Sequence, residues 1–204
     1  MIYIMLGGPA TGKGTRANIL AKELGLIHIS TGELLREHAK ENEEIDKLIS
    51  NGEFVPDEVI NKLLKEKMLT NEAKNGVVLD GYPRTLSQAE TLKDMLKDMN
   101  LEITSAIELV APKELVFKRI LQRKECPDCS RSYGVDFPSK DGIHCDDCNA
   151  VLETRSDDTE ETLTKRIKTY EEKTKPILDF YRKQNLLKTI DSSHAPSKIM
   201  DVTK

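Results

Sequence analysis

The sequence predicts an α/β protein whose parallel sheet is flanked by helices. Met1 to Leu6, Gly76 to Asp80 and Ile103 to Val110 are short, nearly continuous apolar runs. Such runs are typical of strands buried on both faces, as parallel sheets require. Stretches with apolar residues three and four positions apart lie between them, and strands that alternate with helices favour a parallel sheet.

In the first half of the chain, a helix is expected over Thr15 to Leu24, where the apolar residues have helical spacing. A short strand over Leu26 to Ile29 leads into Ser30 to Glu33, whose residue types suit a helix cap. Residues 31 to 50 are then helical and polar. A further helix is expected from Pro56 to about Met68.

After the second strand, Ser87 and Glu90 match a capping box for a helix that runs to about Met99. Pro112 opens another helix after the third strand. Residues 124 to 155 break this alternation, because they contain four cysteines, many turn-forming residues and little periodicity. We interpret them as an insert.

The C-terminal part contains one long helix and one last strand. Asp158 and Glu161 match a cap for the helix, which is expected to kink before Pro176, and Leu187 to Ile190 form the strand. No internal repeat is visible. At 204 residues the chain can bury one good core with room for small inserts.

The composition of the chain disfavours several classes of function. The formal charge of −4 gives no general attraction to nucleic acid or to an anionic membrane. The longest apolar run has about six residues, against about 18 for a bilayer span. The first strand begins at Met1, which leaves no room for a signal peptide. We expect a cytoplasmic monomer, since nothing in the sequence demands a partner chain.

The first strand runs into a glycine loop that predicts a phosphate site. Gly7, four further residues, Gly12 and Lys13 fit the Walker A spacing, although Gly14 stands where Ser or Thr is usual and Thr15 comes one place later. Glycines let successive N–H groups point at an anion, and the helix that follows turns its positive end toward it. A glycine-rich turn with a surface lysine is the alternative.

Several arginines lack a local acid partner. Arg119 and Arg123 share one helical face with no carboxylate three or four positions away, and Arg166 has uncharged helical neighbours. Like charges at this spacing repel unless an anion neutralises them. One interpretation is that these arginines bind the phosphate groups of a ligand. The other is that they lie on a solvated helix face or pair with distant acids such as Asp157 and Asp158.

Cys126, Cys129, Cys145 and Cys148 form a CxxC pair repeated after fifteen residues, the spacing of a four-cysteine zinc site. Four protein ligands leave no open position, so the metal would be structural; iron would fit the same ligands. Over 124 to 155 there are four basic and seven acidic residues, which disfavours binding to nucleic acid. His144 could compete as a ligand.

Together, the glycine loop, the Asp80 to Thr85 segment, the paired arginines and the four-cysteine insert closely resemble the adenylate kinase family, in its long-lid, zinc-containing bacterial form. The resemblance runs from Met1 to about Asp191 and implies a P-loop NTPase-like core over 1–29, 56–123 and 158–204. It also implies a small helical insert over 30–55 that binds the nucleoside monophosphate, and a zinc-stapled lid over 124–157.

The resemblance implies Mg-dependent, reversible transfer in which ATP and AMP give two ADP under a closing lid. The residues it implies for ATP are Gly8, Pro9, Ala10, Thr11, Gly12, Lys13, Gly14, Thr15, Arg119, Arg123, Ser132, Tyr133 and His194. Those for AMP are Thr31, Arg36, Glu53, Phe54, Val55, Gly81, Tyr82, Pro83, Arg84, Gln88, Arg155 and Arg166. The catalytic set is Lys13, Arg84, Arg119, Arg123, Arg155 and Arg166, with Asp80 orienting magnesium through water.

Two positions depart from the family pattern. Ala10 stands where glycine is usual, which would stiffen the loop, and Ser192 follows Asp191 where glycine is common, which puts the adenine contact of the His194 carbonyl in question. Two other functions remain open: a related kinase that uses UMP, CMP or GTP, and a P-loop ATPase whose zinc ribbon recruits a macromolecule.

Overall fold

Five parallel strands form the centre of the computed structural model, which describes residues 1–155 and 157–203. The spatial order is β2-β3-β1-β4-β7, and each neighbouring pair is parallel. The strands are β1 (Ile2–Gly7), β2 (Ile27–Ser30), β3 (Val77–Asp80), β4 (Ser105–Val110) and β7 (Leu187–Asp191). The predicted α/β class, a mostly parallel sheet flanked by helices, is confirmed.

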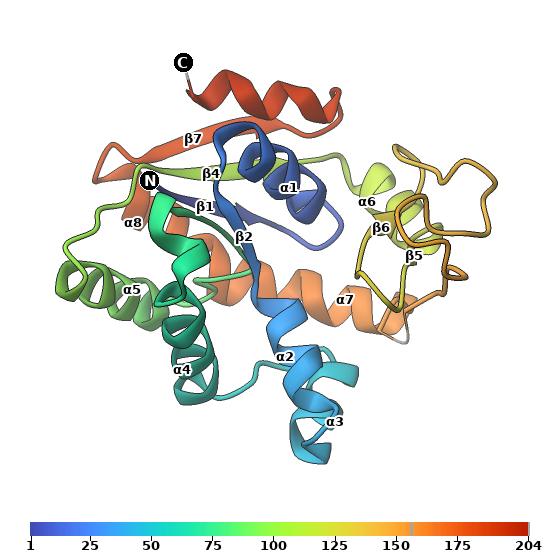
Figure 1. Cartoon of the computed structure of the whole chain (residues 1–204), viewed down its shortest axis with the longest axis horizontal. Helices are drawn as coiled ribbons and strands as arrows, with labels where there is room; N and C mark the ends of the chain where they lie inside the picture. The colour runs from blue at the N-terminus through green and yellow to red at the C-terminus, as the bar shows by residue number, and fades with distance from the viewer. Residues whose placement is uncertain (156, 204) are drawn as a thin grey trace.

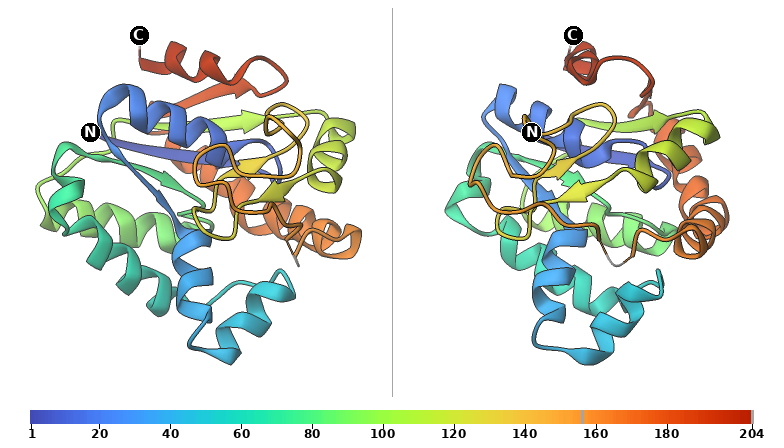
Figure 2. Two further views of the ribbon diagram at one scale, coloured as in Figure 1. Left: turned by 45° about the vertical axis from the view of Figure 1, so that its right-hand side comes forward. Right: turned by 90° about the vertical axis from the view of Figure 1, so that its right-hand side faces the viewer.

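Helices cover both faces of the sheet (Figures 1 and 2). On one face lie α1 (Lys13–Leu24) and the C-terminal 3₁₀ helix η3 (Pro196–Thr203). On the other lie α4 (Asp57–Met68), α5 (Leu86–Asp98) and α8 (Lys175–Arg182). Within the described residues, the helices are too short or too polar to cross a bilayer.

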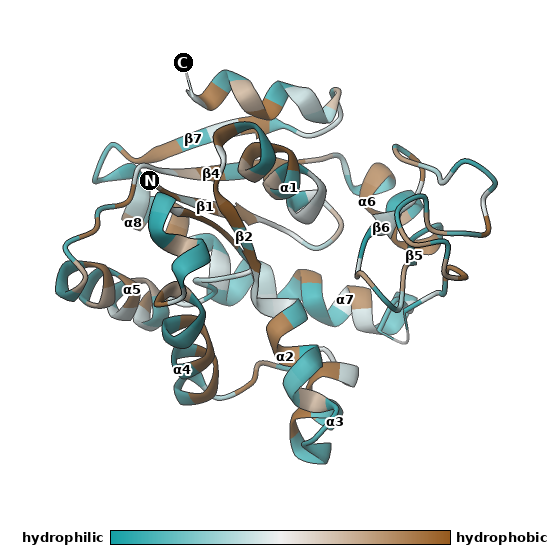
Figure 3. Cartoon of the chain, in the orientation of Figure 1, coloured by the Kyte–Doolittle hydropathy of each residue, from teal (hydrophilic) through white to brown (hydrophobic). Residues whose placement is uncertain are grey.

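The central strand β1 shows why the sheet is buried on both sides. Its residues alternate: Ile4 and Leu6 belong to the core with α4, α5 and α8, whereas Tyr3 and Met5 belong to the core with α1 and η3. All are at most 4 % exposed. Accordingly, Figure 3 colours β1, at the centre of the sheet, brown for hydrophobic.

Two small groups of elements project from this core at the carboxyl ends of the strands (Figure 1). The first contains α2 (Thr31–Ala39) and α3 (Glu43–Ser50), which pack around Ile45 and Val55. The second, called here the cysteine segment, comprises residues 124–155 with the hairpin β5 (Lys124–Glu125) and β6 (Ser132–Tyr133). Cys126, Tyr133, Cys145 and Leu152 form its own small core.

The remaining helices join these parts. α6 (Lys113–Leu121) follows β4, and α7 (Glu160–Thr169) leads from the cysteine segment back to the sheet. A π-helical turn, η2 (Tyr170–Thr174), separates α7 from α8 just before Pro176, the position at which the sequence predicts a kink. A 3₁₀ turn, η1 (Asn71–Asn75), precedes β3.

Two expected helix caps were wrong. The cap of α5 is Thr85, whose hydroxyl accepts from the Gln88 N–H, and not Ser87. The cap of α7 is Thr159, whose hydroxyl accepts from the Thr162 N–H. Asp158 does not cap this helix, because its carboxylate pairs with Arg123. Arg123 lies just after the end of α6, so the helical face that it was expected to share with Arg119 does not extend to it.

Candidate functional site

The glycine loop curls between β1 and α1 as the Walker A spacing predicts. Gly12 adopts a left-handed φ of 82°, and the Lys13 ammonium group donates to the carbonyls of Gly7 and Gly8 at 3.0 and 2.7 Å. Ala10 also has a positive φ of 54°, a conformation that costs an alanine roughly 1 kcal/mol more than a glycine. The loop therefore keeps its shape at a local energetic cost.

Asp80 lies beside this loop, at the carboxyl end of β3. A Cβ on Gly14 would lie 3.3 Å from Asp80 Oδ2, so the glycine at this position lets the carboxylate approach the first turn of α1. Burial alone would raise the pKa of Asp80, but His28 and Lys13 lower it overall. The enclosed position of Lys13 lowers the pKa of its ammonium group to about 8, although Asp80 opposes this shift.

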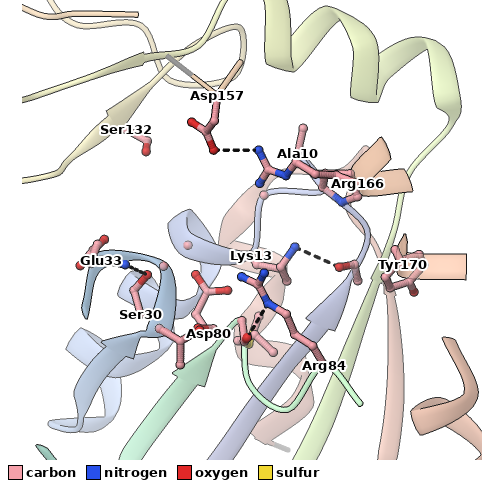
Figure 4. Close-up of a pocket in the computed structure, with 18 of the residues that line it drawn as sticks. Ala10, Lys13, Ser30, Glu33, Asp80, Arg84, Ser132, Asp157, Arg166 and Tyr170 are labelled. Atoms are coloured by element: carbon pink, nitrogen blue, oxygen red, sulfur yellow. Dashed lines mark hydrogen bonds and ion pairs between the residues drawn. The ribbon is translucent and has the colours of Figure 1, made fainter. Parts of the chain in front are cut away.

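One cavity of about 310 Å³ extends from the glycine loop to the two projecting groups, and Figure 4 shows part of its lining. The predicted residues that line it are Pro9, Ala10, Gly12, Lys13, Gly14, Thr15, Thr31, Arg36, Glu53, Phe54, Val55, Asp80, Gly81, Tyr82, Pro83, Arg84, Gln88, Arg119, Arg123, Ser132, Tyr133, Arg155 and Arg166. Gly8, Thr11 and His194 are not among the lining residues.

Several arginines around this cavity are paired with acids, two of them across longer stretches of the chain and one with an acid two positions away. Arg123 forms a two-pronged ion pair with Asp158, and Arg155 forms one with Asp157 at 2.8 and 2.6 Å. Arg166 Nη1 lies 3.2 Å from the same Asp157, as Figure 4 shows. The alternative that such arginines pair with Asp157 and Asp158 is thus confirmed, and the same side chains also line the cavity.

These pairs fix the charge states of the cluster. Burial alone would raise the pKa of Asp157, but the hydrogen bond from Arg155, with Arg166 and Arg123 nearby, lowers it to about 2. Burial lowers the pKa of Arg166 to about 10, which Asp157 partly opposes. Asp157 and Arg166 are therefore both charged at neutral pH.

Glu125 connects the cysteine segment to α2. Its carboxylate lies 3.5 Å from Arg36 Nη2 and 3.3 Å from Arg155 Nη1. Each carboxylate oxygen of Glu125 pairs with a different arginine. This acid of β5 therefore holds Arg36 of α2 beside Arg155 of the cysteine segment. The two projecting groups are in contact across the mouth of the cavity.

Residues of α2, α5 and the turn after β3 also line the cavity, and Asp57 of α4 supports them. Gln88 accepts from the Arg84 N–H and donates to Asp57, both at 2.7 Å. The Arg84 guanidinium lies over the Phe54 ring, 5.6 Å from its centroid. Thr31 donates to the carbonyl of Asp80 at 3.1 Å. Hydrogen bonds thus hold these residues in place against the sheet.

The four cysteines converge as their spacing predicts. Their sulfur atoms all lie within 4.8 Å of one another, and three pairs are 3.3, 3.5 and 3.8 Å apart. Four thiolates around Zn²⁺, each about 2.3 Å from it, lie about 3.8 Å apart, so the donor set fits a tetrahedral ion. His144 turns its Nδ1 to Asp141 at 2.7 Å and is no competing ligand.

Sequence reasoning missed several residues here. His28 places its Nε2 3.6 Å from Asp80 Oδ2, beside the cavity. Arg16, Glu125 and Asp136 line the cavity itself. One signal was available for Arg16: a charged residue beside Ala17 and Leu20 on the apolar face of a helix needs a buried partner.

A parallel sheet with a glycine loop after its first strand, a lysine in that loop and converging arginines defines the class of P-loop nucleotide kinases. The comparisons place the chain within that class. The family model described as Adenylate kinase matches residues 5–186. The chain belongs to the adenylate kinase family of phosphotransferases, and its length fits the long-lid type.

Curated relatives agree over nearly their whole length. The adenylate kinase of Thermotoga petrophila is 43 % identical over 200 residues, which is 95 % of this chain and 91 % of the relative. That of Archaeoglobus fulgidus is 40 % identical over 198 residues, with the same two shares. That of Clostridium perfringens strain SM101 is 37 % identical over 207 residues, or 98 % and 95 %.

Proposed function

We propose that the protein transfers the γ-phosphoryl group of ATP reversibly to AMP, giving two ADP. The observation that carries this proposal is that one cavity is lined both by the glycine loop and by Thr31, Arg36 and Arg84. We call the part beside the glycine loop the donor lobe and the part lined by Thr31, Arg36 and Arg84 the acceptor lobe. Two nucleotides that enter from opposite lobes would bring their phosphates together beside Lys13.

In the donor lobe, the loop N–H groups and Lys13 would hold the β- and γ-phosphates of ATP. Arg119 and Arg123 would neutralise charge that develops on the transferring group. Positioning and charge stabilisation supply nearly all the catalysis of such a transfer. We assign the donor base to the part of the cavity lined by Ser132 and Tyr133. His194 would take part only through its backbone carbonyl, since it does not line the cavity.

In the acceptor lobe, Arg36 and Arg84 would bind the α-phosphate of AMP, while Arg155 and Arg166 face both nucleotides. The remaining contacts would come from Thr31, Gln88, the Glu53–Phe54–Val55 segment and the Gly81–Tyr82–Pro83 turn. Gln88 is held by Asp57 and by the Arg84 N–H, so its role is to orient the turn. The fixed geometry of this lobe supports a preference for one monophosphate.

We assign two metal roles to this chain. Asp80, a charged carboxylate next to the first turn of α1, would hold Mg²⁺ through water. When bound, the ion neutralises charge on the β- and γ-oxygens. The four cysteines would hold a structural Zn²⁺, because all four donors come from the protein.

The division into core, monophosphate insert (30–55) and lid (124–157) is part of this proposal. The separate small cores around Val55 and around Cys126 support it, since each group packs its own apolar residues. Closure of the lid over both nucleotides would exclude water, so that AMP receives the phosphoryl group. Position 156 lies outside the described residues.

A coupled assay for ADP separates this function from its alternatives. With ATP and Mg²⁺, AMP is expected to support turnover on the order of a hundredfold faster than UMP, CMP or GMP, because a hydrogen-bonded site rejects mismatched bases. GTP in place of ATP tests the donor. Faster turnover with UMP or CMP would show a related kinase. ADP formation that needs an oligonucleotide and not AMP would favour the ATPase.

The pKa of Lys13 gives a pH prediction. Above about pH 8 the ammonium group of the free enzyme loses its proton, so kcat/KM for ATP is expected to fall while kcat stays flat to higher pH. The difference arises because bound phosphates favour the charged lysine. Lys13→Arg keeps its charge and should lack this alkaline limb. The same limb in the arginine variant would contradict the assignment to Lys13.

A further inference from the structure

Arg16 is a buried cation on the first turn of α1, three residues after Lys13. Its side chain is 1 % exposed, and its Nη2 donates to two backbone carbonyls, those of Ser192 at 2.9 Å and His194 at 2.8 Å. Both carbonyls belong to the loop that follows β7. The helix that begins at Lys13 is therefore tied to this loop through a single nitrogen atom.

Arg119 reaches the same loop from α6. Its Nη2 donates to the Ser192 carbonyl at 2.7 Å, and its Nη1 donates to the Ser192 hydroxyl at 3.2 Å. Its Nε donates to Asp136 of the cysteine segment at 2.6 Å. Two arginines thus share one carbonyl oxygen. A continuous chain of hydrogen bonds runs from the cysteine segment to α1 through Asp136, Arg119, Ser192 and Arg16.

Stability alone does not explain this arrangement. Burial and the neighbouring Arg119 lower the pKa of Arg16, and its Nε has no hydrogen-bond partner among the described residues. Asp136 pairs with Arg119 and not with Arg16 directly among the described residues. A buried, incompletely paired charge is usually no more stabilising than an apolar side chain of similar volume. A role in orienting other groups accounts for the energetic cost of burying the Arg16 charge.

The position of Arg16 and Arg119 indicates which groups they orient. Arg16, Arg119 and Asp136 line the cavity together with Pro196 of the same loop. If the phosphates of the donor occupy the glycine loop, the rest of that nucleotide must extend along these residues. The 192–196 loop and the Arg119 guanidinium then form one wall of the donor lobe.

We propose that Arg16 and Ser192 are positioning residues, which fix Arg119 and the 192–196 loop against the donor nucleotide. This inference rests on the proposed function. Neither residue needs to touch the transferring group. Their effect is expected to be confined to the donor lobe, because the side chain of Arg16 bonds to the loop after β7 and Ser192 bonds to Arg119.

The test compares KM for ATP with KM for AMP. Arg16→Gln shortens the side chain and removes the charge, and we expect about a tenfold higher KM for ATP with KM for AMP within about twofold. Arg16→Lys should restore KM to within about threefold, because one nitrogen makes both hydrogen bonds. Ser192→Ala keeps the shared carbonyl and should raise KM for ATP about threefold. Lys22→Gln, on the exposed face of α1, is the matched control.

Equal rises in the two KM values, or a lower melting temperature with neither KM changed, would show a structural role only and overturn the inference. If Arg16→Gln fails to fold, Ser192→Ala decides the question: a KM for ATP equal to that of the wild type overturns it. Absence of AMP-dependent ADP formation by the wild-type protein would instead refute the proposed function, so the two failures are distinguishable.

Discussion

Lys13→Met is expected to lower kcat by roughly 10³-fold, the largest effect of any single substitution considered for this chain. The lysine is the cation of the glycine loop, its ammonium group lies 2.7 Å from the Gly8 carbonyl, and its side chain lines the cavity. Methionine has a similar length and volume but no charge. A phosphoryl group in transfer would lose its nearest fixed positive charge.

The same substitution should leave the melting temperature at pH 7 unchanged or higher. A lowered pKa means that the folded state disfavours the charged lysine, so this cost is fully present below about pH 8 and disappears with the charge. Lys22→Met on the exposed face of α1 is the matched control and should leave kcat within about twofold. A kcat loss below about tenfold in folded Lys13→Met would contradict the catalytic role.

Cys148→Ser is expected to release the metal and to lower the melting temperature by on the order of 10 °C, while turnover at low temperature is retained. Metal content by elemental analysis, melting by calorimetry and the coupled assay check these three results. The physical reason is that the cysteine segment has few buried apolar residues of its own, mainly Tyr133 and Leu152 beside the sulfurs. Elemental analysis of the wild-type protein also separates zinc from iron.

Asp128→Asn, in the same turn as Cys126 and Cys129, is the control, since it lies exposed and leaves all four thiolates in place. It should keep both the metal and the melting temperature. If Cys148→Ser stays folded but loses all activity at low temperature, a catalytic metal would have to replace the structural one.

Features encoded over short stretches were predictable from the sequence. The glycine loop is one continuous segment, and β1 carries its burial in six consecutive residues. The cysteines follow from spacing alone, because two short turns can place four sulfurs together. In each case the residues that cooperate are close along the chain, or repeat a pattern whose geometry is known.

Features that depend on distant residues were not predictable. The Arg123–Asp158 pair spans 35 positions, and the Arg16 bond to Ser192 spans 176. Nothing local distinguishes Asp158 from a helix cap, and the cap was the wrong interpretation because an ion pair with Arg123 engages that carboxylate. Tertiary contacts decided which of two compatible local roles the residue has.

Asp157 is bonded to Arg155 and lies near Arg166, so these two guanidinium groups already have an anionic partner within the protein. A phosphate that approaches them competes with a carboxylate tethered at short range, whose effective concentration exceeds that of dilute ions in the cell. We therefore expect isolated sulfate or inorganic phosphate to exchange poorly with this carboxylate. A ligand with several phosphates would meet several arginines and Lys13 at once, so we expect the internal carboxylates to favour polyphosphates over small anions.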